Sequence, residues 1–193
     1  FGITYIGYDK SLGVKVAVKE CFPEQMVGRY EGTKEVHLWN ESLQERYREN
    51  LEGFEKEAKI LAQLLEKRVG GLVHVKKRFE ENGTAYMVME YVDGKSLYEY
   101  VQEQGGRLSV KEALELLYPI GQLVAQLHQH GLIHRDIKPD NIMIDAQKKT
   151  TLIDFGASME FENAKNNEKI FSPLYSPREQ RMGEGQGRST DIY

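Results

Sequence analysis

The polar run "HRDIKPDN" at residues 134–141 limits the possible folds of this chain more than any other sequence feature. It follows the apolar "GLI" and a long amphipathic stretch, and the apolar runs "NIMI" and "TTLIDFG" come after it. Asp, Asn and Pro are ordinary turn residues, so a solvated turn would explain much of the composition. A turn would not explain the position between a helix pattern and two strand patterns. The sequence therefore predicts a loop whose position is fixed by the helix before it and the two strands after it.

The hydrophobic period changes along the chain in a definite order. Alternating residues rich in Val, Ile, Tyr and Thr predict a strand, a turn and a strand over 1–22. Apolar residues three and four positions apart predict a long helix over 40–67. Two strands joined by "EENGT" are expected at 73–79 and 85–92, and helices after the turn "DGKS". This order predicts an α+β fold whose first part is rich in strands and whose second part is mainly helical.

Two local signals refine these helices. Gly53 weakens the middle of the first long helix by up to about 1 kcal/mol, so two shorter helices are an alternative there. Ser109 and Glu112 have the spacing of a capping box at the start of the second long helix. Gly131 is well placed to end that helix.

Composition limits the classes of function. The net charge of −4 gives no electrostatic reason to expect a nucleic-acid partner. The single cysteine, Cys21, cannot form a disulfide within the chain, which favours a reducing, cytoplasmic compartment and a buried apolar role. No apolar run is long enough to cross a bilayer, so no membrane segment is expected in this fragment.

Charged residues at three separate places would suit phosphoryl transfer. Lys19 lies on the strand "VAVK", Asp136, Lys138 and Asn141 share the polar run, and Asp154 follows the apolar "TLI". Phosphoryl transfer needs cations on the phosphates, oxygen ligands for Mg²⁺, and an acceptor beside the attacking hydroxyl. The two lysines meet the first need, Asn141 and Asp154 the second, and Asp136 the third.

These residues resemble the protein-kinase signature motifs, in the same order along the chain. "VAVK" at 16–19, "HRDIKPDN" at 134–141 and "DFG" at 154–156 match that set, and Gly2 resembles the end of its glycine-rich loop. The chain is therefore similar to a eukaryotic-like (Hanks-type) serine/threonine kinase of the bacterial kind. Lys138 supports the serine/threonine class, since tyrosine kinases usually carry another pattern there.

The resemblance implies a role for each residue of the motifs. Asp136 would accept or orient the proton of the attacking hydroxyl, and Lys138 would stabilise charge on the transferred group. Lys19 would hold the inner phosphates of ATP, oriented by Glu57 in "FEKEAKIL". The partner implied is a protein substrate with a serine or threonine acceptor.

ATP and Mg²⁺ are the cofactors that the resemblance implies. Asn141 and Asp154 would be the metal ligands. "YMVMEYVDG" resembles the kinase hinge, with Met89 as gatekeeper and with the Glu90 carbonyl and the Val92 amide meeting adenine. The nucleotide-binding residues would be Gly2, Thr4, Ala17, Lys19, Met89, Glu90, Val92, Met143, Ile153 and Asp154.

The resemblance also divides the chain into domains. Residues 1–92 would form the kinase N-lobe, with an insertion at about 22–50 before the αC helix, and 93–193 a partial C-lobe. "SPLYSPRE" at 172–179 resembles the substrate-binding segment, with Ser172 in place of a threonine. Asp191 resembles the aspartate that opens the next helix and steadies the catalytic loop.

Two further expectations concern activation and completeness. Glu168 could pair with Arg135 in place of an activating phosphate, although a solvated charge is the simpler interpretation. The chain starts without an initiator Met and stops at "TDIY", as a fragment truncated at both ends would. We expect residues 1–193 alone to be poorly stable and nearly inactive, because the catalytic loop must be held rigidly.

Two other functions remain open at this point. A pseudokinase or ATP-binding scaffold would share the fold without turnover, although every catalytic residue is present. A small-molecule phosphotransferase of kinase-like fold is the second alternative. Such enzymes usually have a shorter catalytic loop without the Lys-Pro pair, and they lack a segment of the "SPLYSPRE" type.

Overall fold

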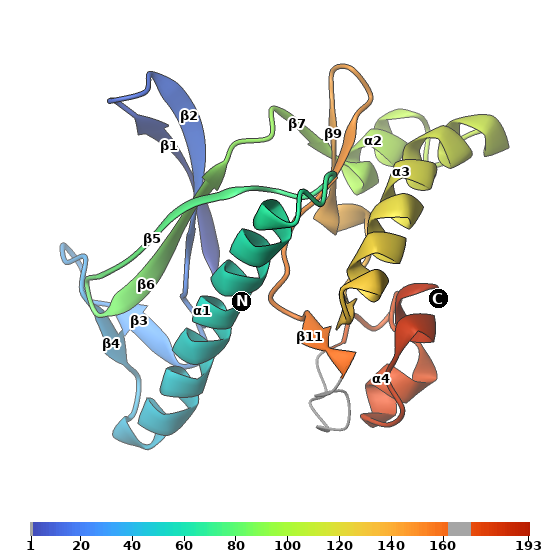
Figure 1. Ribbon diagram of the computed structural model, residues 1–193. Coiled ribbons are helices and arrows are strands. Elements are labelled where there is room, and N and C mark those ends of the chain that lie inside the picture. Colours follow the sequence, from blue (N-terminus) through green and yellow to red (C-terminus); the bar gives the residue numbers. More distant parts are fainter. Residues whose placement is uncertain (1, 162–170) are drawn as a thin grey trace. The chain divides into compact units, whose positions relative to one another are not determined.

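The computed structural model describes residues 2–161 and 171–193, which form two compact units (Figure 1). The first unit contains the described residues up to Lys67 together with Val73–Tyr91. The second contains Arg68–Leu72 and the described residues of Val92–Tyr193. The segment Arg68–Leu72 joins the second unit because Leu72 forms a parallel bridge with Leu152.

A four-stranded antiparallel sheet forms the first unit, in the order β1-β2-β6-β5. Its strands are β1 (Ile3–Asp9), β2 (Val14–Glu20), β5 (Val75–Glu81) and β6 (Thr84–Glu90). The strands expected near both ends of this unit are therefore present. Their turns carry left-handed residues, Gly13 between β1 and β2 and Asn82-Gly83 between β5 and β6. Asn-Gly is the preferred pair for a two-residue hairpin, which explains why "EENGT" turns where it does.

The long helix α1 (Gln44–Glu66) is continuous through Gly53, so the alternative of two shorter helices is wrong. It follows the 3₁₀ turn η1 (Glu41–Leu43), which Asn40 caps by accepting a hydrogen bond from Ser42 N. The helix contacts β5 and β6, and its buried side chains include Phe54 and Leu61. Burial of this apolar face compensates for the glycine, because tertiary packing supplies most helical stability.

Residues 22–50 contain an additional hairpin that the sequence pattern did not reveal. Strands β3 (Val27–Arg29) and β4 (Val36–Leu38) pair antiparallel, with Val27 opposite Leu38. Their inner face packs into a small core with Met26 and Tyr47. The strands are only three residues long, which is too short for a periodic signal.

The described part of the second unit combines helices with two small sheets of short strands. Its longer elements are α2 (Leu97–Glu103), α3 (Val110–Gln129), β9 (Ile142–Asp145) and β10 (Thr150–Leu152). The shorter ones are β7 (Gly94–Ser96), β8 (Leu132–Ile133), η2 (Pro139–Asn141), β11 (Met159–Glu160), α4 (Arg178–Met182) and η4 (Arg188–Asp191). One sheet has the order β10-β9-β7, and β8 pairs with β11. Helix α3 contacts β8, which precedes the polar run in the sequence, and β10, which follows it. The polar run therefore lies between two strands that pack against the same helix.

Two local expectations for this unit were wrong. "DGKS" is not only a turn, because β7 begins at Gly94 and pairs with β9. The complete capping box belongs to Ser96 and Glu99 at the start of α2. Ser109 does cap α3 by accepting from Glu112 N at 3.2 Å, but the Glu112 carboxylate instead accepts from the hydroxyl of Tyr100. Competition from that cross-helix partner explains the half-formed box.

Within the two described stretches, no helix is both long and apolar enough to span a bilayer.

Candidate active site

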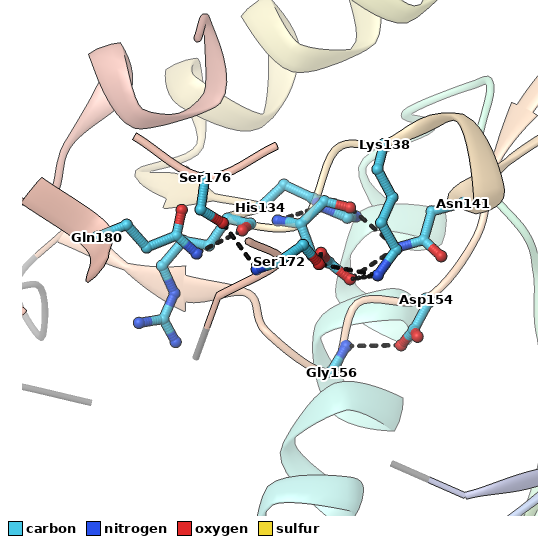
Figure 2. A network of polar contacts seen from close by, with 10 residues as sticks. His134, Lys138, Asn141, Asp154, Gly156, Ser172, Ser176 and Gln180 are labelled. Atoms are coloured by element: carbon cyan, nitrogen blue, oxygen red, sulfur yellow. Dashed lines mark hydrogen bonds and ion pairs between the residues drawn. The ribbon is translucent and has the colours of Figure 1, made fainter. Parts of the chain in front are cut away.

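The polar run folds into a loop around the carboxylate of Asp136. Figure 2 shows Lys138 and Asn141 of this loop. Asp136 Oδ2 accepts from Lys138 Nζ at 2.9 Å and from Asn141 Nδ2 at 2.8 Å. The same Nδ2 donates to the backbone oxygen of Asp136 at 2.9 Å. Asn141 is the last residue of η2, and its burial holds the side-chain amide within hydrogen-bond distance of Asp136. These bonds hold one oxygen of the carboxylate and leave the other, Oδ1, for a different partner.

That partner is the hydroxyl of Ser172. Ser172 Oγ donates to Asp136 Oδ1 at 2.7 Å and accepts from Lys138 Nζ at 3.1 Å. Ser172 is itself positioned by a tight turn, in which its N–H donates to Ser176 Oγ at 2.9 Å. An alcohol therefore fits beside the carboxylate at the distance that proton transfer requires. The ammonium at 3.1 Å from the same oxygen would stabilise negative charge developing there.

Asp154 lies beside this loop in a left-handed backbone conformation, with φ of 65°. Ile153 N donates to the Asn141 carbonyl at 2.8 Å, which joins the segment containing Asp154 to the polar loop. Gly156 N donates to Asp154 Oδ1 at 3.2 Å (Figure 2). Asp tolerates a left-handed conformation better than most residues, and such strain often marks a functional position.

The oxygen atoms of Asn141 and Asp154 suit a hard divalent cation. The Asn141 amide directs its Nδ2 toward Asp136, so its Oδ1 is the atom left to act as a ligand. Mg²⁺ prefers oxygen ligands and commonly takes one or two carboxylates together with waters and phosphates. No cluster of three or more His, Cys, Asp or Glu side chains able to hold a metal occurs among the described residues. The donor set thus fits a metal held partly by a phosphate ligand.

In the first unit, Lys19 on β2 and Glu57 on α1 form a buried ion pair. Lys19 Nζ lies 2.8 Å from Glu57 Oε1 and 3.0 Å from Oε2, so the carboxylate binds the ammonium with both oxygens. Both side chains are nearly inaccessible to solvent. Buried charges are retained only when paired. Each residue therefore holds the other in a defined orientation.

The residues that the resemblance places around adenine belong to both units. In the first unit, Ala17 is paired with Met89 across β2 and β6, and Thr4 is paired with Lys19 across β1 and β2. Glu90 ends β6, and its N–H donates to the His74 carbonyl at 2.9 Å. Their shared role in nucleotide binding stays a prediction.

The remaining predicted nucleotide-binding residues occupy defined places within each unit. Met143 is paired with Thr151 across β9 and β10, and Val92 belongs to the second unit. Gly2 precedes β1, where an added Cβ would lie 1.9 Å from the Glu20 carbonyl oxygen. Only glycine allows that approach of two backbones.

A buried aspartate at the C-terminal end of the second unit anchors the polar loop from behind. Asp191 accepts from His134 N at 2.8 Å and from Arg135 N at 2.7 Å. His128 Nε2, at the end of α3, lies 2.9 Å from Asp191 Oδ2. Gln180 on α4 donates to the Arg135 carbonyl at 2.6 Å. The loop that bears Asp136 is therefore tied to α3, α4 and η4.

His134 is fully buried and packs edge to face against Phe155, with 4.7 Å between ring centroids. Burial lowers the pKa of His134 below its ordinary value, against the smaller raising effect of Asp191, Asp154 and Asp136. The neutral ring accepts from Asp136 N at Nδ1, at 3.3 Å. The buried ring of His134 therefore has a structural role, packed against Phe155 behind the polar loop. Cys21 is likewise buried, which raises the pKa of its thiol to about 11.

Sequence reasoning missed three residues that shape the site. Ser172 was identified only as the counterpart of a threonine, not as a partner of Asp136 and Lys138. His128 and Gln180 gave no signal, because their partners lie 63 and 45 residues away in the sequence. The hypothetical pairing of Glu168 with Arg135 lies outside the described residues. Arg135 Nε donates to the Ala157 carbonyl at 2.6 Å.

A family model described as "Protein kinase domain" matches residues 1–193. "Serine/threonine-protein kinase PrkC" of Bacillus subtilis is 38% identical over 117 residues, which are 59% of this chain and 18% of that protein. "Probable serine/threonine-protein kinase PknB" of Lactococcus lactis is 34% identical over 72% of this chain and 22% of its own length. "Serine/threonine-protein kinase PknA" of Mycobacterium tuberculosis is 33% identical over 75% of this chain and 35% of its own.

Among solved structures, one titled "PpkA-294 apo form" matches all of this chain and 67% of its own chain. The TM-score is 0.84 at 32% sequence identity. The chain thus spans between about a fifth and a third of the length of the curated relatives it matches.

Proposed function

Because the chain belongs to the protein kinase domain family, we propose that it catalyses transfer of the γ-phosphate of ATP to serine and threonine hydroxyls of proteins. The observation that carries the proposal is the environment of Asp136. One of its oxygens is held by Lys138 and Asn141, and the other accepts a hydroxyl at 2.7 Å. A substrate hydroxyl bound in the same way would be oriented for attack, with its proton directed to the carboxylate.

Lys19 and Lys138 supply the positive charge that the reaction requires. Lys19, held by both oxygens of Glu57, would bind the inner phosphates of ATP. Lys138 would stabilise the transferred group, since its Nζ already lies 3.1 Å from the Ser172 hydroxyl oxygen. A fixed cation costs no reorganisation during the reaction, which makes its effect on the barrier large.

Asn141 and Asp154 would hold Mg²⁺, and the residues paired across β2 and β6 would contact adenine. Bound Mg²⁺ neutralises phosphate charge and orients the β- and γ-phosphates. Asn141 would contribute Oδ1, because its Nδ2 donates to Asp136. Asp154 would contribute its carboxylate from a left-handed backbone position. Gly2, Thr4, Ala17, Met89, Glu90, Val92, Met143 and Ile153 complete the proposed nucleotide site.

Protein substrates are favoured over small molecules by the chain's own segments. Ser172 lies in "SPLYSPRE", and its hydroxyl contacts both Asp136 and Lys138, so this segment adjoins the proposed acceptor site. The relatives from Bacillus subtilis and Mycobacterium tuberculosis are named as serine/threonine-protein kinases. A scaffold without turnover would not need the complete set of Lys19, Asp136 and Asp154. A cytoplasmic location is part of the proposal, supported by the single buried cysteine.

Transfer of label from γ-labelled ATP by the complete protein tests the proposal. Parallel reactions should contain a serine- and threonine-bearing protein acceptor or a mixture of small amino and hydroxyl compounds. We expect label in phosphoserine or phosphothreonine after acid hydrolysis of the protein acceptor, and none in the small molecules. Label confined to the small molecules would identify a small-molecule phosphotransferase. ATP binding without any transfer would identify a scaffold.

A further inference from the structure

The β3–β4 hairpin carries three adjoining aromatic rings on the face opposite its small core. Tyr30 and His37 stack with centroids 3.9 Å apart and planes 6° from parallel. His37 meets Trp39 edge to face at 5.2 Å. Val27 and the other inward residues of the hairpin pack against Tyr47, so the three rings lie on the side that the unit's core does not use. We refer to Tyr30, His37 and Trp39 as the aromatic face.

The aromatic face is preorganised, because contacts within the chain already fix the position of the Trp39 ring. Gly28 is paired with His37, and a Cβ added to Gly28 would lie 2.2 Å from the Trp39 ring. The indole therefore rests on the glycine backbone. Trp39 Nε1 also donates to the Glu24 carbonyl at 2.9 Å, which fixes the rotation of the ring. Rings held in this way lose little conformational entropy on binding, which is the property of efficient contact residues.

Despite this order, the outer two rings remain largely in solvent. Tyr30 is 67% exposed and Trp39, the chain's single tryptophan, is 57% exposed. Large exposed rings that are fixed in place and contiguous mark a contact surface more than scattered apolar residues do. No residue of the proposed phosphoryl-transfer site lies on this hairpin, so the surface requires another explanation.

The charges around the aromatic face are mainly negative. Residues 24–41 contain four glutamates, all exposed: Glu24, Glu31, Glu35 and Glu41. Of the two basic residues in the same stretch, Arg29 is engaged by the buried carboxylate of Glu20. Lys34 is then the remaining basic side chain of the hairpin. Glu31 follows Tyr30 directly, and Glu24 is joined to Trp39 through its carbonyl, so both exposed rings have a carboxylate-bearing neighbour.

We propose that the aromatic face is a docking surface for an arginine- or lysine-rich segment of a second protein. Guanidinium and ammonium groups are attracted to the faces of Trp and Tyr rings. The surrounding glutamates complement the same groups and speed the encounter with a basic partner. An acidic or phosphate-bearing ligand would meet the glutamates unfavourably. The inference is independent of the proposed phosphoryl transfer, because the rings and the glutamates would bind such a segment whether or not the chain is active.

Binding of labelled peptides to the complete protein tests this surface. The probe is a fluorescein-labelled nonapeptide with four arginines spaced by Gly and Ser, and its matched control has glutamine at the four arginine positions. Fluorescence anisotropy should show saturable binding of the arginine peptide that weakens as salt rises, and no binding of the glutamine peptide. Tyr30→Ala and Trp39→Ala should each weaken binding about two- to fivefold, the usual effect of one exposed cation–π contact.

Three further variants separate docking from damage to the fold. Tyr8→Ala removes a similarly exposed ring from β1 and should leave binding unchanged. The double change Glu31→Gln with Glu35→Gln keeps all three rings and should weaken binding and flatten its salt dependence. Gly28→Ala should displace the Trp39 ring and act like Trp39→Ala. Phosphoryl-transfer activity toward a peptide without arginine should be unaffected in all of these variants.

Three results would overturn the proposal. Equal binding of the glutamine peptide would show that charge plays no part. Unchanged affinity in both ring variants would place the basic peptide elsewhere on the protein. If the complete protein fails to bind the peptide but binds it after proteolytic removal of a flanking segment, the occupant would be a segment of the same chain and not a second protein.

Discussion

Replacement of Asp191 by asparagine should destabilise the second unit strongly, because this carboxylate is fully buried and has several partners. It accepts from His134 N and Arg135 N at 2.8 and 2.7 Å, and His128 Nε2 lies 2.9 Å from it. Asparagine has the same shape but only one acceptor oxygen. Its Nδ2 would face a backbone N–H, so that one hydrogen bond is lost and a buried donor is left unsatisfied.

The magnitude follows from those two losses. A hydrogen bond to a charged acceptor contributes about 1.5–3 kcal/mol, and a buried unsatisfied donor costs about 1–3 kcal/mol. We therefore expect Asp191→Asn to lower the free energy of unfolding by about 3–5 kcal/mol, the range found when one partner of a buried charged network is removed. Because the same bonds hold the backbone that precedes Asp136, the turnover number should also fall by at least about tenfold in protein that remains folded.

Urea unfolding of the complete catalytic domain measures the first effect, and steady-state kinetics the second. Asp145→Asn is the matched control. Asp145 also accepts two backbone hydrogen bonds, from Gln147 N and Lys149 N, but in an exposed turn. That variant should cost at most about 1 kcal/mol. A cost for Asp191→Asn no larger than for Asp145→Asn would refute the reasoning that Asp191 anchors the loop.

Three other changes test separate parts of the site. Glu57→Gln removes the carboxylate that binds the buried Lys19 ammonium with both oxygens, so the free energy of unfolding should fall by about 1.5–3 kcal/mol and ATP affinity should drop; an unchanged ATP affinity would exclude an orienting role for Glu57. Ser172→Ala removes the hydroxyl that contacts Asp136 and Lys138, so kcat should fall about tenfold. Ser172→Thr keeps a hydroxyl and should retain activity. An equal fall of kcat in both variants would show that the size of the side chain matters and not its hydroxyl. His134 has a lowered pKa, so as pH falls below 6.5 the unfolded chain takes up a proton that the folded chain does not, and the free energy of unfolding should fall. Urea unfolding of wild type and His134→Phe between pH 7 and 5 should show a smaller decline in the variant, and parallel declines would contradict the assignment.

The sequence predicted the elements with strong periodicity and distinctive turns. The α+β kinase-like fold class is confirmed by the family match and by the solved structure with a TM-score of 0.84. β1, β2, α1, β5 and β6 lie close to their expected ranges, because alternation and the Asn82-Gly83 turn are local signals. The motif residues could be identified because each chemical role allows few residue types. Their assignment to ATP and Mg²⁺ stays a prediction that the variants above test.

What the sequence did not predict depends on contacts between distant residues. The hairpin of β3 and β4 has strands of three residues, and its core forms only when Tyr47 of α1 packs against Val27. The Glu112 carboxylate, which the sequence placed in a capping box, instead accepts a hydrogen bond from the hydroxyl of Tyr100 on α2. The anchoring of Asp191 by His128 spans 63 residues. No periodic pattern encodes such pairs, since they result from how the elements pack.

The most direct test of the proposed function is the effect of Asp136→Asn on the complete protein. Asparagine keeps the shape of the side chain but cannot take the proton of a hydroxyl donor such as Ser172. We expect phosphoryl transfer to fall by at least about 10²-fold, while the dissociation constant for ATP with Mg²⁺ changes by less than about threefold, since Lys19 and Asp154 are intact. Transfer at the wild-type rate by the Asp136→Asn protein would contradict the account.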